Sequence, residues 1–190
     1  MRLEKLVGDI QNEMYQKIAE NNTMEKEEAE KTAKQVALSA IKYGDLSNQA
    51  SKDYIFDIDR FTSFEGDTGP YILYTIVRIK SILAKYQVQG KSLENLCLEE
   101  AQGASEKDLM RQLCSFNAMM DSACEETAPH KICAYIYDLA NAFNKFYHET
   151  KILAEEDQKK QAGWIALLKL TKEVLETCID VLGFSAPDRM

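Results

Sequence analysis

The sequence predicts an all-α protein built as a helical bundle. Apolar residues recur at intervals of three and four over several long segments, a spacing that marks one face of an amphipathic helix. The chain shows neither strand–helix alternation nor an internal repeat. Its 190 residues are 45% hydrophobic, which is enough to bury a sizeable core in one or two domains.

Two helices are predicted at the N-terminus. The first covers residues 3–20, with apolar positions at Leu3, Leu6, Ile10, Met14 and Ile18. The second is expected to be capped by Thr23, to carry acidic residues in its first turns and to end near Gly44. Residues 45–70 then read as a long irregular connection, and ordered connections of this length tend to be functional.

A third helix is predicted from Tyr71, directly after a Gly-Asp-Thr-Gly-Pro turn. At about 100° per residue, one narrow arc of this helix must face a core, and it holds Ile72, Ile76, Ile79 and Leu83. A different arc, separated from the first by more than about 100°, holds Tyr71, Tyr74, Arg78 and Lys85. These four side chains either cap a neighbouring helix or form an aromatic platform with a guanidinium, suited to stacking an unpaired base.

The second half of the chain is also predicted to be helical. A loop and a short helix are expected over residues 86–107, followed by an amphipathic helix over 107–124. A Thr-Ala-Pro-His step starts the next helix, over 130–148, because proline favours a first helical turn. After a charged loop, the last helix covers 164–182 and ends at Gly183. The result is a bundle of about five or six helices.

Catalytic and metal-binding signals are weak. His130 and His148 lie outside any local cluster of His, Cys and Asp, so neither a metal site nor a triad is predicted. The glycine-rich loops that bind nucleotide phosphates are missing as well. Asp57 and Asp59 form a possible acid–base pair, but we interpret them as turn and capping residues.

The charge distribution limits the kinds of nucleic-acid contact. The chain carries 23 basic and 31 acidic residues, a net charge of −8, so a broad attraction to phosphate is excluded. Residues 67–90 are the exception, with three basic residues and one acidic residue. Any contact with nucleic acid is therefore expected to be local and specific in shape, and DNA is not an expected partner.

Cysteine usage and hydropathy predict a cytoplasmic protein. The five cysteines are widely spaced without a Cys-x-x-Cys pair, which favours reduced and mostly buried thiols: Cys97, Cys114, Cys124, Cys133 and Cys178. No apolar run approaches the roughly 20 residues of a membrane span, and the N-terminus lacks the apolar block of a signal peptide.

Motifs spread over the whole chain resemble the arginyl-tRNA synthetase family. Residues 40–79 contain Lys-Tyr-x-Asp-Leu-Ser, then Asp-Tyr-x-Phe, then Glu-Gly-Asp-Thr-x-Pro-Tyr. Residues 129–153 are similar to a helix pair in the core of the family's anticodon-binding domain, and LGFSAPDRM at 182–190 is similar to its terminal motif. The resemblance implies a helical bundle of the class I synthetase anticodon-binding type at 67–190, with an N-terminal helical stem-contact segment at 1–66.

The resemblance also implies a binding site. In the family, the pocket for the middle anticodon cytidine is built from positions that here are Tyr71, Tyr74, Arg78 and Met190. The turn before them is implied to act as a hinge between the anticodon and the distant active site: Gly66, Asp67, Thr68, Gly69 and Pro70. Three positions depart from the family's usual residues, namely Ala50, Leu73 and Trp164.

The function implied is the tRNA-binding part of an arginine–tRNA ligase. The chain lacks the His-x-Gly-His signature of the catalytic fold, so it is expected to be inactive alone and to need no cofactor, whereas the complete enzyme uses ATP and Mg²⁺. The expected partners are tRNA for arginine and the catalytic domain of the parent synthetase, with no membrane partner. The alternative is an independent helical interaction protein that has kept the fold and lost its RNA.

Overall fold

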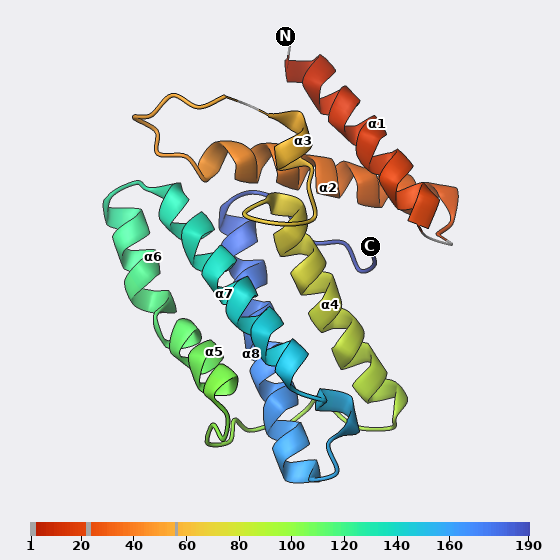
Figure 1. Cartoon of the computed structure of the whole chain (residues 1–190), viewed down its shortest axis with the longest axis vertical. Helices are drawn as coiled ribbons and strands as arrows, with labels where there is room; N and C mark the ends of the chain where they lie inside the picture. The colour runs from red at the N-terminus through yellow and green to blue at the C-terminus, as the bar shows by residue number, and fades with distance from the viewer. Residues whose placement is uncertain (1–2, 22–23, 56) are drawn as a thin grey trace.

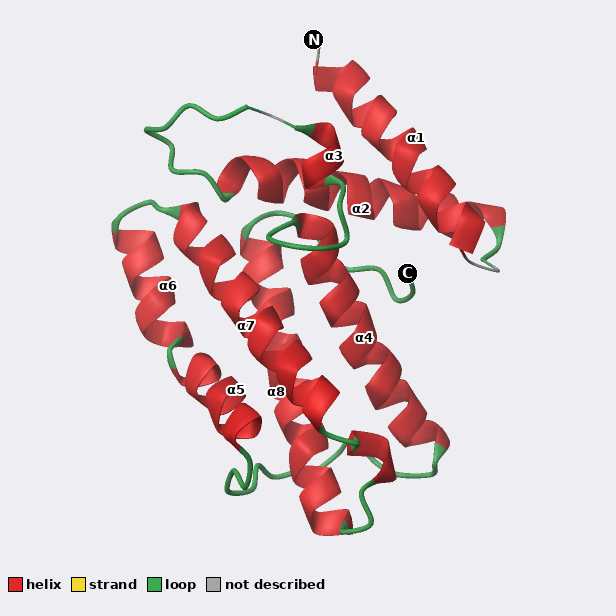
Figure 2. Cartoon of the chain, in the orientation of Figure 1, coloured by secondary structure: helices red, strands yellow, loops and turns green. Residues whose placement is uncertain are grey.

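The computed structural model describes residues 3–21, 24–55 and 57–190, and within these ranges it contains helices and no strands (Figure 2). Eight α-helices and one 3-10 helix follow one another: α1 (Leu3–Asn21), α2 (Lys26–Leu46), α3 (Ile58–Phe61), α4 (Gly69–Val88), α5 (Ala104–Cys114), α6 (Phe116–Glu125), α7 (Pro129–Glu149), η1 (Ile152–Ala154) and α8 (Gln158–Val181). The prediction of an all-α bundle is confirmed. In the described part of the chain, no helix is both long and apolar enough to cross a membrane.

The helices form a bundle with a layer across one end. Helices α4, α7 and α8 run side by side, and α5 and α6 flank α7 (Figure 1). Helices α1 and α2 contact each other and cross the end of the bundle at which α4 begins. Because α2 contacts both α4 and α7, the start of α4 is enclosed by a second layer.

The core face of α4 is the one predicted from the sequence. Ile72, Ile76 and Ile79 are fully buried, and Leu83 is almost so. Leu73 is also fully buried, so the leucine at this unusual family position packs in the core. Burial of aliphatic side chains at about 25 cal/mol per Å² is the main stabilising term for such a bundle.

Several element boundaries differ from the prediction. The segment predicted as one helix over 107–124 is two helices, α5 and α6, which meet at Ser115, where the backbone amide and the hydroxyl both donate to the carbonyl of Gln112. α5 begins earlier than expected, at Ala104, whereas α4 extends to Val88 and no helix lies between them.

The N-terminal half differs from the prediction at Gly44. Helix α2 continues past this residue to Leu46. A Cβ at Gly44 would lie 2.8 Å from the Phe61 ring, so the missing side chain makes room for α3. The connection after α2 is irregular except for α3, whose N-cap Asp57 accepts a hydrogen bond from the amide of Arg60, which confirms the capping interpretation. The predicted cap Thr23 lies outside the described residues.

The prediction that most cysteines are buried is wrong. Cys133 and Cys178 are buried, but the other three are exposed because they lie on a loop and on the outer faces of α5 and α6. All five are free thiols, as predicted. Burial raises the pKa of Cys133 and of Cys178 to about 12.

Candidate nucleic-acid interface

The turn before α4 orients the first residues of the candidate site. The Thr68 hydroxyl accepts a hydrogen bond from the Tyr71 amide (3.2 Å) and donates to the carbonyl of Ser63 (2.6 Å). Thr68 is therefore the N-cap of α4, and Pro70 lies in the first helical turn, where its fixed φ is compatible with helix. Gly66 has a φ of 80°, which favours glycine.

The same turn is fixed to the layer formed by α2. The fully buried Tyr43 hydroxyl lies 2.5 Å from a carboxylate oxygen of Asp67 and 2.9 Å from the carbonyl of Cys133. Burial, and the hydrogen bond to Asp67, raise the pKa of Tyr43 well above its usual range. A Cβ on Gly69 would lie only 2.3 Å from the carbonyl oxygen of Ser39, so the backbones of α2 and α4 touch at this point.

Three of the four predicted site residues lie together. Tyr71, Tyr74 and Arg78 line a single pocket of about 450 Å³. Its other lining residues come from the preceding turn and from α7: Phe64, Glu65, Asn144 and His148. Lys85, on the same arc of α4, is exposed and lies outside this pocket.

Arg78 is held between α4 and α7. One terminal nitrogen donates to Oδ1 of Asn144 (2.5 Å), and the other donates to the Tyr74 hydroxyl (3.1 Å). The guanidinium carbon also lies 4.7 Å from the ring centroid of Tyr74 and 5.1 Å from that of Tyr147, which is cation–π geometry. Arg78 is half-buried, so its charge is only partly exposed to solvent.

The two tyrosines differ in exposure. The Tyr71 hydroxyl donates to Asn141 (2.8 Å) and accepts from Asn144 (2.9 Å), and burial raises its pKa. Tyr74 keeps 40% of its surface exposed. Tyr71 and Arg78 bond to a neighbouring helix, which agrees with the first interpretation of this arc. The second stays a prediction, for which Tyr74 presents an aromatic surface to solvent.

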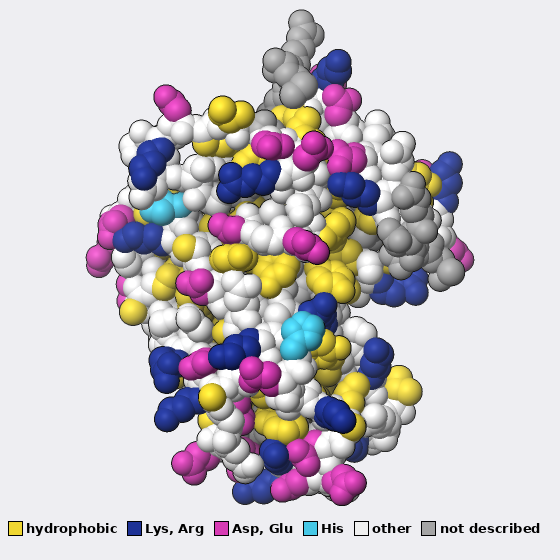
Figure 3. Space-filling model, in the orientation of Figure 1, with side chains coloured by type: hydrophobic (Ala, Val, Ile, Leu, Met, Phe, Trp, Pro, Cys, Tyr) yellow, Lys and Arg dark blue, Asp and Glu magenta, His cyan; other side chains and the backbone are white. Residues whose placement is uncertain are grey.

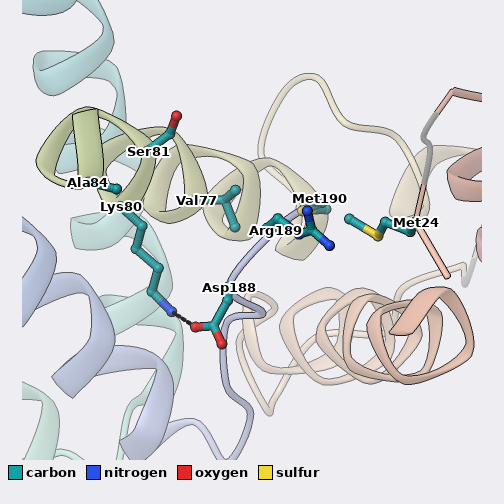
Figure 4. A pocket seen from close by; sticks show the side chains of 8 residues that line it. All are labelled: Met24, Val77, Lys80, Ser81, Ala84, Asp188, Arg189 and Met190. Atoms are coloured by element: carbon teal, nitrogen blue, oxygen red, sulfur yellow. Dashed lines mark hydrogen bonds and ion pairs between the residues drawn. The ribbon is translucent and has the colours of Figure 1, made fainter. Parts of the chain in front are cut away.

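Met190 does not join the other three. It lines a different pocket of about 540 Å³ on the neighbouring face of α4, with Val77 and Lys80 on one side and Met24 on the other (Figure 4). Lys80 donates to the carbonyl of Pro187 (3.2 Å) and pairs with Asp188, so the C-terminal tail is held against α4. The prediction of one pocket containing all four residues is corrected in this respect.

The contribution of α7 to the site was not predicted. The ring of Tyr147 packs against Phe143 and also contacts the guanidinium of Arg78. The signal that could have revealed this face is a polar stripe at intervals of three and four, Asn141, Asn144 and His148. Of the other residues considered, His130 lies in the first turn of α7, far in sequence from this stripe.

The distribution of charged side chains on the surface is consistent with the small, local contact expected from the net charge. Basic and acidic side chains are interspersed over the face in Figure 3, with no broad basic field. Within the described ranges, no three His, Cys, Asp or Glu side chains gather in a way that could hold a metal ion. Trp164, one of the unusual family positions, packs edge-on against Phe146 (5.9 Å between centroids) rather than facing this site.

Comparison with known proteins gives consistent matches. Residues 72–190 match the family described as DALR anticodon binding domain, and residues 1–58 match the family described as tRNA synthetases class I (R), catalytic domain. Two relatives named arginine–tRNA ligase cover the whole chain, one from Agathobacter rectalis with 64% identity over 198 residues and one from Alkaliphilus oremlandii with 48% over 190.

The chain spans about a third of the length of these relatives, 33% and 32% respectively. A solved structure of the arginyl-tRNA synthetase of Thermus thermophilus aligns over 100% of this chain and 32% of its own, with a TM-score of 0.88 and 27% identity.

Proposed function

Since this chain belongs to the arginyl-tRNA synthetase family and contains its DALR anticodon-binding domain, we propose that it binds the anticodon loop of tRNA for arginine. The observation that carries the proposal is the pocket of Tyr71, Tyr74 and Arg78, which combines an exposed ring with a guanidinium on the one net-positive segment of an acidic chain. Unpaired bases are recognised by stacking on such rings and by hydrogen bonds to their edges.

The chemistry of the pocket favours cytosine over uracil. A guanidinium has five N–H donors and no acceptor, and two of the nitrogens of Arg78 each have a protein acceptor. The remaining donors suit a base edge with two adjacent acceptors, such as N3 and O2 of cytosine. Uracil has an N–H at position 3, so it would place a donor against a donor.

The second pocket extends the proposed surface. Met190 and Lys80 lie on the neighbouring face of α4, so a nucleotide next to the one in the Arg78 pocket would contact them. In this proposal Met190 supplies an apolar contact to the loop without closing the Arg78 pocket.

The remaining assignments concern the longer protein. We place the stem-contact segment at residues 1–66 and the anticodon-binding bundle at 67–190, a division supported by the two family matches on either side of the turn. The proposed partners are tRNA for arginine and a catalytic domain in the cytoplasm. That domain would use ATP and Mg²⁺ to ligate arginine, and this chain holds no cofactor in the proposal.

Binding of short hairpin RNAs tests the proposal. One hairpin carries cytidine at the middle anticodon position and the other uridine, and titrations at fixed low salt measure both affinities, because the net charge of −8 makes binding salt-sensitive. We expect the cytidine hairpin to bind more tightly. Loss of base stacking in Tyr74→Ala should cost about 1–3 kcal/mol of binding free energy.

Lys85→Ala is the matched control, since it removes a cation from the same arc of α4 outside the pocket. It should weaken both hairpins slightly and equally. Equal affinity for the two hairpins, or unchanged affinity in Tyr74→Ala and Arg78→Ala, would show that the pocket does not read the anticodon and would favour an interaction protein without an RNA role.

A further inference from the structure

We infer that Asn144 of α7 is a positioning residue that sets the direction in which Arg78 meets the base. This inference rests on the proposed function, because it concerns how the same pocket achieves its selectivity. Nothing in the sequence motifs assigned a role to Asn144, and its place in the pocket appears only when α7 packs beside α4.

The amide of Asn144 can take only one orientation. Its neighbours are a terminal nitrogen of Arg78 at 2.5 Å on one side, and the hydroxyl oxygens of Tyr71 (2.9 Å) and Thr75 (3.2 Å) on the other. A guanidinium has no acceptor, so the oxygen of the amide must face Arg78 and the nitrogen must face the two hydroxyls.

The protons of these hydroxyls are already committed elsewhere. Tyr71 donates to Asn141 (2.8 Å), and Thr75 donates to the backbone carbonyl of Tyr71 (3.0 Å). Both hydroxyl oxygens are therefore free to accept from Asn144, and each N–H of Asn144 and each hydroxyl hydrogen of Tyr71 and Thr75 has one acceptor. Asn144 uses both of its N–H groups on α4, and its oxygen accepts from Arg78, so its amide has no donor left for a base.

We therefore expect its effect on RNA to pass through Arg78, the group that its oxygen holds. The guanidinium also contacts the rings of Tyr74 and Tyr147, but ring contacts leave the plane free to rotate. The hydrogen bonds to Asn144 (2.5 Å) and to the Tyr74 hydroxyl (3.1 Å) fix which donors point into the pocket, and the bond to Asn144 is the shorter one. Without it, RNA binding would have to order the long Arg78 side chain, which we expect to reduce the affinity for the cytidine hairpin by about tenfold.

A double-mutant cycle tests this role. Affinities for the cytidine and uridine hairpins are measured for Asn144→Leu, Asn144→Ala, Arg78→Ala and the double variants, each checked for folding by thermal melting. Leucine is close to asparagine in size and alanine is a good helix former, so at least one variant should keep the fold. Asn141→Ala is the control, because Asn141 is exposed and accepts from Tyr71 rather than from Arg78.

Positioning predicts two results that a purely structural role would not produce. The preference for cytidine over uridine should fall in both Asn144 variants but not in Asn141→Ala. In the Arg78→Ala background, the Asn144 substitutions should cost nothing further, since neighbours that act as a unit are not additive.

Additive losses, or an unchanged preference in a folded Asn144 variant, would overturn the inference while leaving the proposed function intact. An Arg78→Ala variant that binds both hairpins as the wild type does would instead refute the proposed function itself.

Discussion

Replacing Gly69 by alanine should destabilise the protein strongly, because the first residue of α4 touches the backbone of α2. The new Cβ would lie 2.3 Å from the carbonyl oxygen of Ser39 and 2.5 Å from its carbonyl carbon, whereas real Cβ atoms essentially never come within 3.0 Å. Both neighbours are backbone atoms of a buried helix turn, so the two helices must move apart. Overpacking of this kind costs about 1–3 kcal/mol, and a backbone clash belongs at the upper end.

The gain in helix propensity offsets less than about 1 kcal/mol of that cost, so a net loss of about 2–3 kcal/mol remains. For a chain of this size the melting temperature should fall by about 5–10 °C, which circular dichroism at the helix band measures directly. Gly8→Ala is the control, since Gly8 lies inside α1 with nothing within 4 Å of an added Cβ. It should raise the melting temperature by a few degrees, about 2–4 °C. If Gly69→Ala melts at or above the wild-type temperature, α2 and α4 are not locked together at the turn, and the reasoning fails.

Three further predictions follow from burial and charge. Tyr43→Phe should lower the free energy of unfolding by about 1–2 kcal/mol in urea titrations, because the Asp67 carboxylate loses the hydrogen bond from the buried Tyr43 hydroxyl. Tyr54→Phe removes an exposed hydroxyl and should change this free energy by less than about 0.5 kcal/mol. A thiol reagent at neutral pH should modify the three exposed cysteines of the native protein, which are Cys97, Cys114 and Cys124, and all five in denaturant. Equal reactivity of all five in the native state would contradict the assigned burial. The hydrogen bond from Arg189 lowers the pKa of Glu28, so this pair stabilises the fold above the ordinary glutamate pKa of about 4.5, and the contribution is lost as the pH falls through the lowered value. The difference in urea midpoint between wild type and Arg189→Ala should therefore disappear on acidification, and a difference that persists at the lowest pH would refute it.

The sequence predicted correctly those features that depend on a single helix. On α4, residues spaced by three and four fix both the buried arc and the arc of Tyr71, Tyr74 and Arg78, because each lies on a single rigid helix. It was insufficient where a feature depends on contact between distant segments. Gly44 resembled a helix end, but its missing side chain accommodates Phe61 from α3, and no local pattern reports such a contact.

The same limit explains the errors in the site. The family resemblance groups Met190 with Tyr71, Tyr74 and Arg78, yet the path of the C-terminal tail, held by Lys80, places it on the neighbouring face of α4. Asn144 could not be assigned to the pocket, nor Tyr147 to its contact with Arg78, until α7 was known to lie beside α4. Periodicity identifies which residues share a face of one helix, but it does not identify what that face meets.

The contacts around the turn also constrain how the proposed anticodon site could influence a distant active site. A hinge needs backbone that can rotate, and in this turn only Gly66, with a φ of 80° and no atom near an added Cβ, is unconstrained by packing. Asp67 is bonded to Tyr43, Thr68 to Ser63, and Gly69 lies against the backbone of α2. Opening the turn at these three positions would break each of those contacts. A shift of α4 on RNA binding would therefore carry α2 with it, and α2 lies within the segment that matches the catalytic-domain family. If the proposed function holds, we expect such a signal to pass as a joint movement of α2 and α4, with rotation of the backbone at Gly66.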